Sequence, residues 1–437
     1  MPLIHVPNPT FEMELEGSPR KLPQAVAELV DELSLLSGLA AARDDVILVN
    51  RPVPRDQLPA SLQTGRYLTR NELRRELQGM SAAERQEWRL QPWGWSASAV
   101  ELVKSLGLSQ SVPDPNAVRW VNTREFAATQ DVTVTETGEL CESHFGWLCR
   151  SEQEVLAALQ ACQQSGDVLW VIKANISHAA RNRQLGAGPT LTDLQRHWLQ
   201  RRLAAGDCVS VEPWVERIAE CGLQWSIGDG NCKGDGAGDI GLSPGEPSTA
   251  IEFSGACVML TDSGGEYRGS VIRRTSAAAA WWRPAELWGR RIVERAAACG
   301  FRGPLGIDCM LFRRRGRLEL RVANDINGRQ TMGRLALALR PWLGATEVGV
   351  WCHPTAVAPE IHQERLRRIA DSGVTVHSTS PANWHGRAAR LQTCLLISED
   401  TDRLQQAVAT LTELAAARHG LREGRPQDWS EKGGRNQ

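Results

Sequence analysis

Two apolar segments on either side of a basic turn constrain the fold of this chain most. They lie within residues 303–322, and the turn Arg313–Gly316 separates them. Apolar runs of this length around a short turn predict an antiparallel β-hairpin. Side chains alternate between the two faces of a strand, so Asp325 and Asn327, which follow the second run, should lie on one face.

This polar end of the hairpin could hold a divalent cation. If Leu311 pairs with Leu318, Asp308 on the first strand shares the same face, whereas a slip of one residue would turn it away. Buried carboxylates side by side are costly unless a cation joins them, and Mg²⁺ prefers such oxygens together with water and phosphate. The candidate metal set is Asp308, Asp325 and Asn327. Alternatively, the hairpin end is structural, and Asn327 or Thr331 caps the helix that follows.

A lysine ends another apolar strand. Residues 168–172 are apolar, and Lys173 follows them at a point where a buried ammonium needs an anionic partner. The next run, Asn175–Gly188, contains Ser177, Arg181 and glycines, so it could wrap a phosphate with N–H groups and cations. In the alternative interpretation, Lys173 only extends its charged end to solvent.

A third polar signal is a proline at the end of the strand over residues 208–212. Pro213 follows Glu212, and it should break strand pairing and leave nearby backbone groups free. Free backbone N–H and C=O groups are what the edge of an adenine can use.

The order of apolar periodicities predicts a mixed α/β protein with three parts. Residues 1–115 indicate a small α/β domain, residues 116–345 alternate helices and strands, and residues 346–437 indicate an α/β extension with a disordered polar tail. The expected strands are 46–49, 168–173, 208–212, 223–227, 305–312, 317–322, 373–377 and 392–397. The expected helices are 23–42, 69–90, 96–107, 151–163, 190–204, 284–299, 360–371 and 401–418.

Charge and composition argue against several classes of protein. The 437 residues hold 50 Lys plus Arg against 51 Asp plus Glu, so no global field would attract nucleic acid or an acidic membrane. The N-terminus lacks the pattern of a signal peptide, and no apolar run approaches the ~18 residues of a membrane span. We therefore expect a cytoplasmic protein without nucleic-acid or membrane partners. The sequence does not determine its oligomeric state.

The order of these segments resembles the ATP-grasp superfamily, the fold of D-alanyl-D-alanine ligases, carbamoyl phosphate synthetases and many amino-acid ligases. The likeness covers about residues 116–345, and residues 1–115 are similar to the N-terminal domain of that family. It rests on five segments in order: 122–126 (NTREF), 171–173 (VIK), 211–215 (VEPWV), 306–308 (GID) and 325–329 (DINGR). The resemblance implies two ATP-grasp subdomains that clamp ATP, with a C-terminal α/β extension.

The same resemblance implies how the nucleotide is bound. Lys173 would contact the α- and β-phosphates, and Arg124 stands where a second phosphate-binding cation is expected. Ser177 and Arg181 would belong to the phosphate loop. The adenine hinge would be formed by Glu212, Trp214 and Val215. One of three further residues would meet the ribose, and the alternatives are Glu216, Glu220 and Gln224.

The catalytic centre implied by the family combines metal and cation. Asp308, Asp325 and Asn327 would hold Mg²⁺ ions, and Arg329 would face the substrate carboxylate or the acyl phosphate. Three positions depart from the family's pattern, because Asp325 replaces Glu, Gly328 replaces Pro, and Ala180 replaces a glycine of the phosphate loop. These changes preserve charge and ligand type, which favours an active enzyme.

The resemblance therefore predicts an ATP-dependent carboxylate-amine ligase that uses ATP and Mg²⁺. ATP would phosphorylate a carboxylate, and an amine would attack the acyl phosphate to give an amide or peptide bond, with Arg329 and Lys173 as catalytic residues. The expected substrates are small molecules, an amino acid or peptide among them. The alternatives are an ATP-binding sensor without catalysis and an enzyme with a thiol or hydroxyl acceptor.

Overall fold

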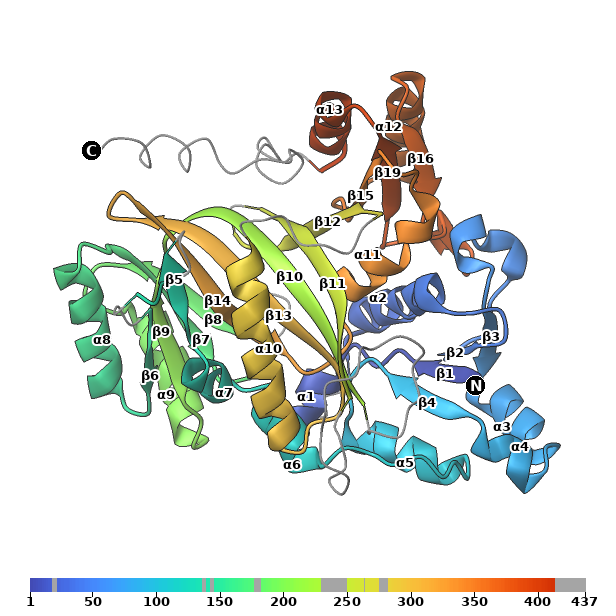
Figure 1. Ribbon diagram of the computed structural model, residues 1–437, viewed down its shortest axis with the longest axis horizontal. Coiled ribbons are helices and arrows are strands. Elements are labelled where there is room, and N and C mark those ends of the chain that lie inside the picture. Colours follow the sequence, from blue (N-terminus) through green and yellow to red (C-terminus); the bar gives the residue numbers. More distant parts are fainter. Residues whose placement is uncertain are drawn as a thin grey trace, which may run out of the picture.

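The computed structural model describes residues 1–17, 22–135, 139–141, 145–176, 182–228, 250–262, 264–274 and 282–412. Within these residues, three sheets of four or more strands organise the molecule (Figure 1). The N-terminal sheet lies beside the C-terminal segment, and the large central sheet separates both from the small sheet. The molecule therefore has two outer parts that meet on one central sheet.

The N-terminal segment forms a parallel sheet with the strand order β3-β2-β1-β4. Its strands are β1 (Leu3–Val6), β2 (Val46–Val49), β3 (Arg66–Thr69) and β4 (Arg89–Pro92), and its helices are α1 (Phe11–Leu15), α2 (Gln24–Leu35), α3 (Arg70–Gln78), α4 (Ala82–Gln86) and α5 (Ala97–Ser105). The strand over 46–49 is confirmed. The helix expected over 69–90 is instead α3 and α4 followed by β4, because α3 ends at Gly79 and Ser81 begins a new capping box.

The small sheet has four antiparallel strands in the order β6-β9-β7-β8. Its elements are β6 (Trp147–Cys149), α8 (Glu152–Gln164), β7 (Leu169–Ala174), β8 (Arg183–Ala187), α9 (Asp193–Ala204) and β9 (Val209–Pro213). On one face, Trp170 and Ile172 are buried with Leu159 of α8 and Leu199 of α9. Because side chains alternate along a strand, the other face carries polar residues. They are Lys173, Ser210 and Glu212.

The central sheet has nine strands in the order β16-β19-β15-β12-β11-β10-β13-β14-β5, and neighbours pair antiparallel. Its elements are β5 (Thr133–Thr135), β10 (Glu216–Gly228), β11 (Ala250–Thr261), β12 (Tyr267–Arg273), α10 (Arg283–Ala298), β13 (Gly303–Arg314), β14 (Arg317–Asn327), β15 (Val348–Cys352), β16 (Thr375–Ser378) and β19 (Cys394–Ser398). Helix α10 covers one face, where Ile292 is buried with Leu223 and Ile307. The other face meets the small sheet, because Arg321 of β14 binds Glu212 of β9.

The C-terminal segment continues the central sheet rather than forming a sheet of its own. Besides β15, β16 and β19, it contains α12 (Pro359–Asp371), the short ribbon β17 (Asn383–Trp384) and β18 (Arg387–Ala388), and α13 (Thr401–Thr412). The sequence predicted β16, β19, α12 and the start of α13, but it missed β11, β12 and β15. Continuous apolar runs such as residues 348–352 lack the alternation that identifies a strand.

A shared apolar core joins the N-terminal and C-terminal segments. It contains Leu35 of α2, Leu62, Leu335, Trp351 of β15 and Leu395 of β19, all of them buried. The helices that connect the sheets are α6 (Pro115–Val121), α7 (Arg124–Thr129) and α11 (Met332–Ala338). These contacts fix the N-terminal segment against the same sheet that carries the hairpin over residues 303–327.

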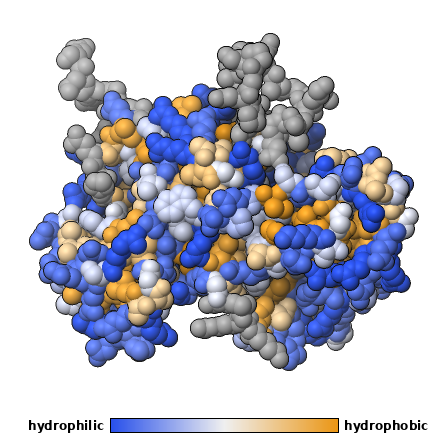
Figure 2. Space-filling view, turned by 90° about the horizontal axis from the view of Figure 1, so that it is seen from below, coloured by the Kyte–Doolittle hydropathy of each residue, from blue (hydrophilic) through white to orange (hydrophobic). Residues whose placement is uncertain are grey.

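The surface is predominantly polar on the side of the molecule in Figure 2, where hydrophobic residues are mixed among hydrophilic ones. Exposed large hydrophobic side chains include Leu194 of α9 and Leu287 of α10, each on a different helix. Among the residues that the structure describes, no helix combines the length and the apolar character needed to cross a bilayer.

His353 follows β15 at the junction between the central sheet and the C-terminal strands. Its ring packs edge-on against Trp351, with ring centroids 4.2 Å apart, and against Tyr267 at 5.1 Å. The ring atom Nε2 is buried and has no hydrogen-bond partner within the described part of the chain. Burial lowers the pKa of His353 from 6.5 to about 3, so its imidazole is neutral in the folded protein near neutral pH.

The buried His353 should make stability depend on pH. Its folded-state pKa lies below the unfolded value, so between pH 6.5 and about 3 the unfolded chain binds a proton that the folded chain does not. The stabilisation is complete above pH 6.5 and decreases as the pH falls. In urea unfolding, His353→Phe should reduce the loss of unfolding free energy between pH 8 and pH 5 by about 2 kcal/mol.

The exposed His197 of α9 supplies the control for this measurement. His197→Asn should retain the wild-type pH dependence, since its imidazole is in contact with solvent. If His353→Phe and wild type lose the same free energy between these pH values, burial of the His353 ring does not have the expected effect.

Candidate functional site

Asp308 of β13 and Asp325 of β14 lie directly opposite each other on neighbouring strands. The register differs by two residues from the one considered above, since Leu311 pairs with Leu320, and a change of two keeps the same face. The Asn327 amide donates to Asp308 Oδ2 at 3.1 Å. The structure therefore brings the three residues of the candidate metal set together on one face of the hairpin.

These carboxylates concentrate negative charge in a half-buried place. Burial, and then the charge of Asp325, raise the pKa of Asp308 to about 7, although Arg329 and the Asn327 amide oppose this rise. A cation would remove the repulsion and offset the cost of burial. Among the described residues, no three His, Cys, Asp or Glu side chains gather as a metal centre. Two carboxylates and an amide suit Mg²⁺ only if water and phosphate oxygens complete its shell.

Arg124 approaches this set from the start of α7. Thr123 caps that helix, which makes Arg124 its first residue. Its Nη2 donates to Asp325 Oδ2 at 2.9 Å. Its backbone N–H donates to Asn175 O at 2.8 Å, which ties α7 to the end of β7. The expected phosphate-binding cation thus lies beside the expected metal ligands and is the partner of one of them.

Lys173 belongs to a buried ionic network that the sequence reasoning missed. Its Nζ donates to Glu212 Oε2 at 2.6 Å, and Arg321 Nη1 donates to the same oxygen at 2.8 Å. Ser210 Oγ donates to Glu212 Oε1 at 2.8 Å, and Asp131 binds Arg321 at 2.9 and 3.1 Å. Burial lowers the pKa of Lys173, whereas Arg321 and Lys173 outweigh burial and hold the pKa of Glu212 well below its usual range.

The adenine hinge differs from its prediction in two respects. The Glu212 side chain is 3% exposed and is held by cations, so it does not face a nucleotide. Strand β9 ends at Pro213 as expected, but the Trp214 N–H donates to Leu169 O at 2.9 Å and is therefore not free. The remaining hinge amide is that of Val215, between β9 and β10.

Two guanidinium groups lie near the Trp214 ring. Arg217 of β10 is 4.8 Å from the ring centroid, and Arg183 of β8 is 5.7 Å from it. Arg183 also donates to Gly264 O, beyond the end of β11. The Trp214 side chain therefore connects the small sheet to the central sheet. Its one relation to an adenine site is that it precedes Val215 in the chain.

An apolar patch adjoins Val215. Met310 and Phe312 of β13 are buried there with Phe145, and the two phenylalanine rings meet edge to face with centroids 5.0 Å apart. No sequence pattern indicated this patch, because alternate apolar residues on β13 are also what a strand places in a core. All three side chains are at most 4% exposed, so they pack on one another and support Val215 from within the protein.

Gln224, one of the three candidate ribose contacts, has a structural position. Thr331 caps α11 by accepting from the backbone of Arg334, and its hydroxyl donates to Gln224 Oε1 at 2.7 Å. Gln224 is 1% exposed, so it cannot meet a ribose in this arrangement. Thr331 is also the helix cap considered as an alternative above, which leaves Asn327 with Asp308.

Glu220 and Glu216 differ in their distance from the carboxylate pair. Glu220 is buried on β10, and its charge contributes to the raised pKa of Asp308. It accepts from Thr261 Oγ1. The Glu216 side chain is 65% exposed and lies 3.5 Å from Arg313. Of the two, Glu220 lies closer to the candidate metal set.

Arg329 faces the N-terminal segment. Its Nε donates to Glu12 Oε1 of α1 at 2.6 Å. The Gly328 N–H donates to Asn122 Oδ1 at 2.9 Å, and a Cβ at position 328 would lie 2.7 Å from Asn122 Nδ2. A proline here would both remove the donor and enter occupied space. The departure from the family's proline therefore has a local cause.

The phosphate loop falls largely outside the described residues. This applies to Ser177, Ala180 and Arg181, the loop positions considered above. The strands on either side pair so that Lys173 lies opposite Arg183. The loop thus joins β7 and β8 at the end of the small sheet that carries Lys173.

Sequence comparisons give no match to a family model or to a curated protein. Comparison with solved structures gives matches. An N5-carboxyaminoimidazole synthetase from Staphylococcus aureus aligns with a TM-score of 0.50 and 11% identity over 94% of this chain and 96% of that chain. Its complex with ADP aligns with a TM-score of 0.49 and 10% identity over 92% of this chain and 94% of that chain. Glycinamide-RNase-transformylase T from Mycobacterium tuberculosis aligns with a TM-score of 0.46 and 16% identity over 94% of this chain and 100% of that chain.

At such low identity, the alignment with a TM-score of 0.50 informs about fold alone. It spans nearly the full length of both chains, so it includes the N-terminal segment and the C-terminal strands as well as residues 116–345. The predicted mixed α/β fold is confirmed. The chain has the ATP-grasp fold, as the order of its sequence motifs predicted.

Proposed function

We propose that this chain is an ATP-dependent ligase that activates a substrate carboxylate as an acyl phosphate and transfers the acyl group to an amine. One observation carries the proposal: opposed carboxylates and phosphate-binding cations meet between two sheets. Arg124 binds Asp325 of the carboxylate pair and lies close enough to Lys173 to affect its pKa. A nucleoside triphosphate with a divalent cation has the complementary charges.

In this proposal the base lies at Val215 and the phosphates lie at Lys173. The Val215 amide, supported by the buried cluster of Phe145, Met310 and Phe312, would bind the edge of the adenine, and Glu220 is the candidate ribose carboxylate that lies closer to the metal set. Lys173 and Arg124 would bind phosphate oxygens. Asp308, Asp325 and Asn327 fit a magnesium ion, which when bound would offset the charge of the triphosphate.

The reaction needs no protein nucleophile. A carboxylate oxygen of the substrate attacks the γ-phosphorus, the bond to the ADP oxygen breaks, and an acyl phosphate forms. The amine nitrogen then attacks the acyl carbon, inorganic phosphate leaves, and the nitrogen loses a proton. Lys173 and Arg124 stabilise charge on the phosphoryl oxygens, and Arg329 holds the carboxylate in line.

The substrates of this proposed reaction are small molecules that enter between α1 and the hairpin. Arg329 binds Glu12 there at 2.6 Å, so a substrate with an anionic and a cationic group could replace each partner of this ion pair. An amino acid or a peptide has both kinds of group, and we propose this class because the sequence motifs resemble those of amino-acid ligases. We also propose that the enzyme acts in the cytoplasm.

One observation favours a second candidate, an ATP-binding protein without turnover. Arg124 and Asp325 satisfy each other at 2.9 Å, so a metal ion at Asp325 has to compete with an existing ion pair. Such a protein would bind ATP but release no phosphate with any substrate pool. Measurement of ADP release therefore separates the two candidates.

Removal of the metal ligands should abolish ADP formation. The double variant Asp308→Asn, Asn327→Ala loses one charge and one oxygen ligand, so ADP release with Mg²⁺ and pooled amino acids and other carboxylates should fall at least ~100-fold. Mass measurement of the product in the wild-type reaction identifies the amide. Asp371→Asn, at the exposed end of α12, should retain activity. ADP release that persists in the folded double variant would contradict the assignment of Asp308 and Asn327 as metal ligands.

Loss of the Lys173 charge should weaken nucleotide binding. Lys173→Met keeps the length of the side chain but removes the ammonium, and the dissociation constant of Mg·ADP should rise about 10- to 100-fold in calorimetry. Retained Arg321 still neutralises Glu212, which protects the fold. Lys104→Met, on the exposed side of α5, should bind as wild type does. Equal affinities of both variants would contradict a phosphate contact of Lys173.

A further inference from the structure

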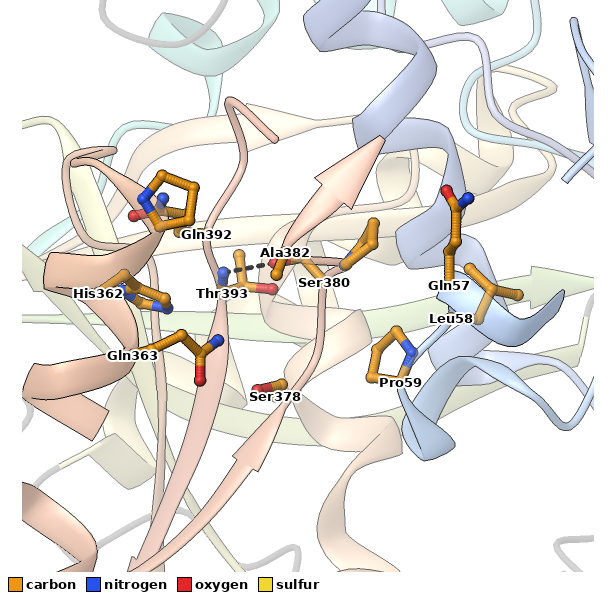
Figure 3. A pocket seen from close by; sticks show the side chains of 12 residues that line it. Gln57, Leu58, Pro59, His362, Gln363, Ser378, Ser380, Ala382, Gln392 and Thr393 are labelled. Carbon is orange, nitrogen blue, oxygen red and sulfur yellow. Dashed lines mark hydrogen bonds between the residues drawn. The ribbon is translucent and has the colours of Figure 1, made fainter. Parts of the chain in front are cut away.

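A cavity of about 220 Å³ lies where the N-terminal segment meets the C-terminal strands (Figure 3). One wall is the segment Gln57–Pro59, which precedes β3. The other walls are the first turns of α12, with His362 and Gln363, and the chain around Ser378 and Ser380 that follows β16. The cavity shares no residue with the candidate nucleotide site.

Among the described buried polar side chains that line this cavity, His362 is the one without a hydrogen-bond partner. It is 7% exposed, and its ring makes no hydrogen bond within the part of the chain that the structure describes. Neighbouring buried groups are satisfied: Gln392 exchanges two hydrogen bonds with the Val357 backbone, at 3.1 and 2.7 Å, and Ser380 Oγ accepts from Thr393 N at 2.8 Å. The His362 ring nitrogens are not among the described polar atoms that are both buried and unpartnered, so they remain accessible from the cavity and can bind a ligand there.

The groups around His362 add donors and acceptors at the mouth of the cavity. The Gln57 and Gln363 side chains reach it from opposite walls, and neither is engaged in a hydrogen bond within the described residues. The Ser378 hydroxyl lies between them, while its carbonyl accepts from Ser61 Oγ at 2.9 Å. Two amides, a hydroxyl and an imidazole can each both donate and accept hydrogen bonds.

No residue that lines the cavity carries a charge at neutral pH. Burial, and then the charge of Arg365, lower the pKa of His362, so its ring stays neutral. An ionic ligand would lose hydration without gaining a counter-charge, which excludes it on energetic grounds. Flat or aliphatic surfaces complete the lining, namely Leu58, Pro59, Pro359 and Pro381.

We propose that this cavity binds a small, uncharged ring compound that carries amide-type donors and acceptors, of the size of a pyrimidine base. Its volume lies below the roughly 300–1,000 Å³ of sites for drug-sized ligands, so it accommodates a single ring and not a nucleotide. The proline and leucine surfaces pack on the ring faces, and His362, Gln57 and Gln363 bind its edge. Because the two sites share no residue, ATP does not compete with this ligand.

Matched pairs of probes test this proposal on the full chain by calorimetry. Uracil and nicotinamide are neutral, and orotate and nicotinate have the same rings with a carboxylate. The neutral members should bind with dissociation constants between about 0.1 and 10 mM, the range open to a ligand of about nine heavy atoms. Their charged counterparts should bind at least tenfold more weakly, and Mg·ATP should not displace the neutral probes.

Two variants locate the binding. Ala382→Phe fills the cavity from an exposed position and should abolish binding of the neutral probes, and His362→Phe should weaken it at least tenfold. Gln406→Ala, on the exposed face of α13, should leave it unchanged. The proposal is overturned if neither neutral probe binds at about 10 mM, if folded Ala382→Phe binds them as wild type does, or if the charged probes bind equally well.

Discussion

The buried carboxylate of Glu212 is the interaction on which the site depends. It lies on the small sheet, yet it binds Lys173 beside it and Arg321 of the central sheet, and Arg321 in turn binds Asp131. Removal of Arg321 would leave the charges of both Glu212 and Asp131 incompletely compensated, so the network fixes the two sheets relative to each other. Lys173, Glu212 and Arg321 therefore have fixed relative positions where the small sheet meets the central sheet.

The opposite wall is set by strand register. Asp308 and Asp325 are directly opposed on neighbouring strands, and α10 occupies the far face of the sheet, so both carboxylates must project toward the small sheet. Their repulsion is an energetic cost that folding alone does not recover. A ligand that contains both a cation and phosphate groups would complement this site, because the cation would reduce the repulsion between the carboxylates and Arg124 would attract the phosphate.

The sequence predicted most elements of this fold and the central part of the site. Apolar periodicity located the hairpin, β7, β9 and the principal helices, and alternation along the hairpin predicted that Asp308, Asp325 and Asn327 share one face, as the structure shows. Arg321 was overlooked because charged and apolar residues alternate over residues 317–322, the pattern of a strand with one face in solvent. Strands β11, β12 and β15 were missed because their apolar runs lack strict alternation, and tertiary pairing alone makes them strands.

The sequence by itself determined which residue types are available and on which face of a strand each one lies, since alternation is a local property. Only the tertiary structure decided their partners. It placed Glu212 against cations rather than an adenine, enclosed Gln224 behind Thr331, and set Arg329 against Glu12, more than 300 positions away in the chain. These contacts arise from packing between sheets, and no local pattern in a sequence encodes the distance between two sheets.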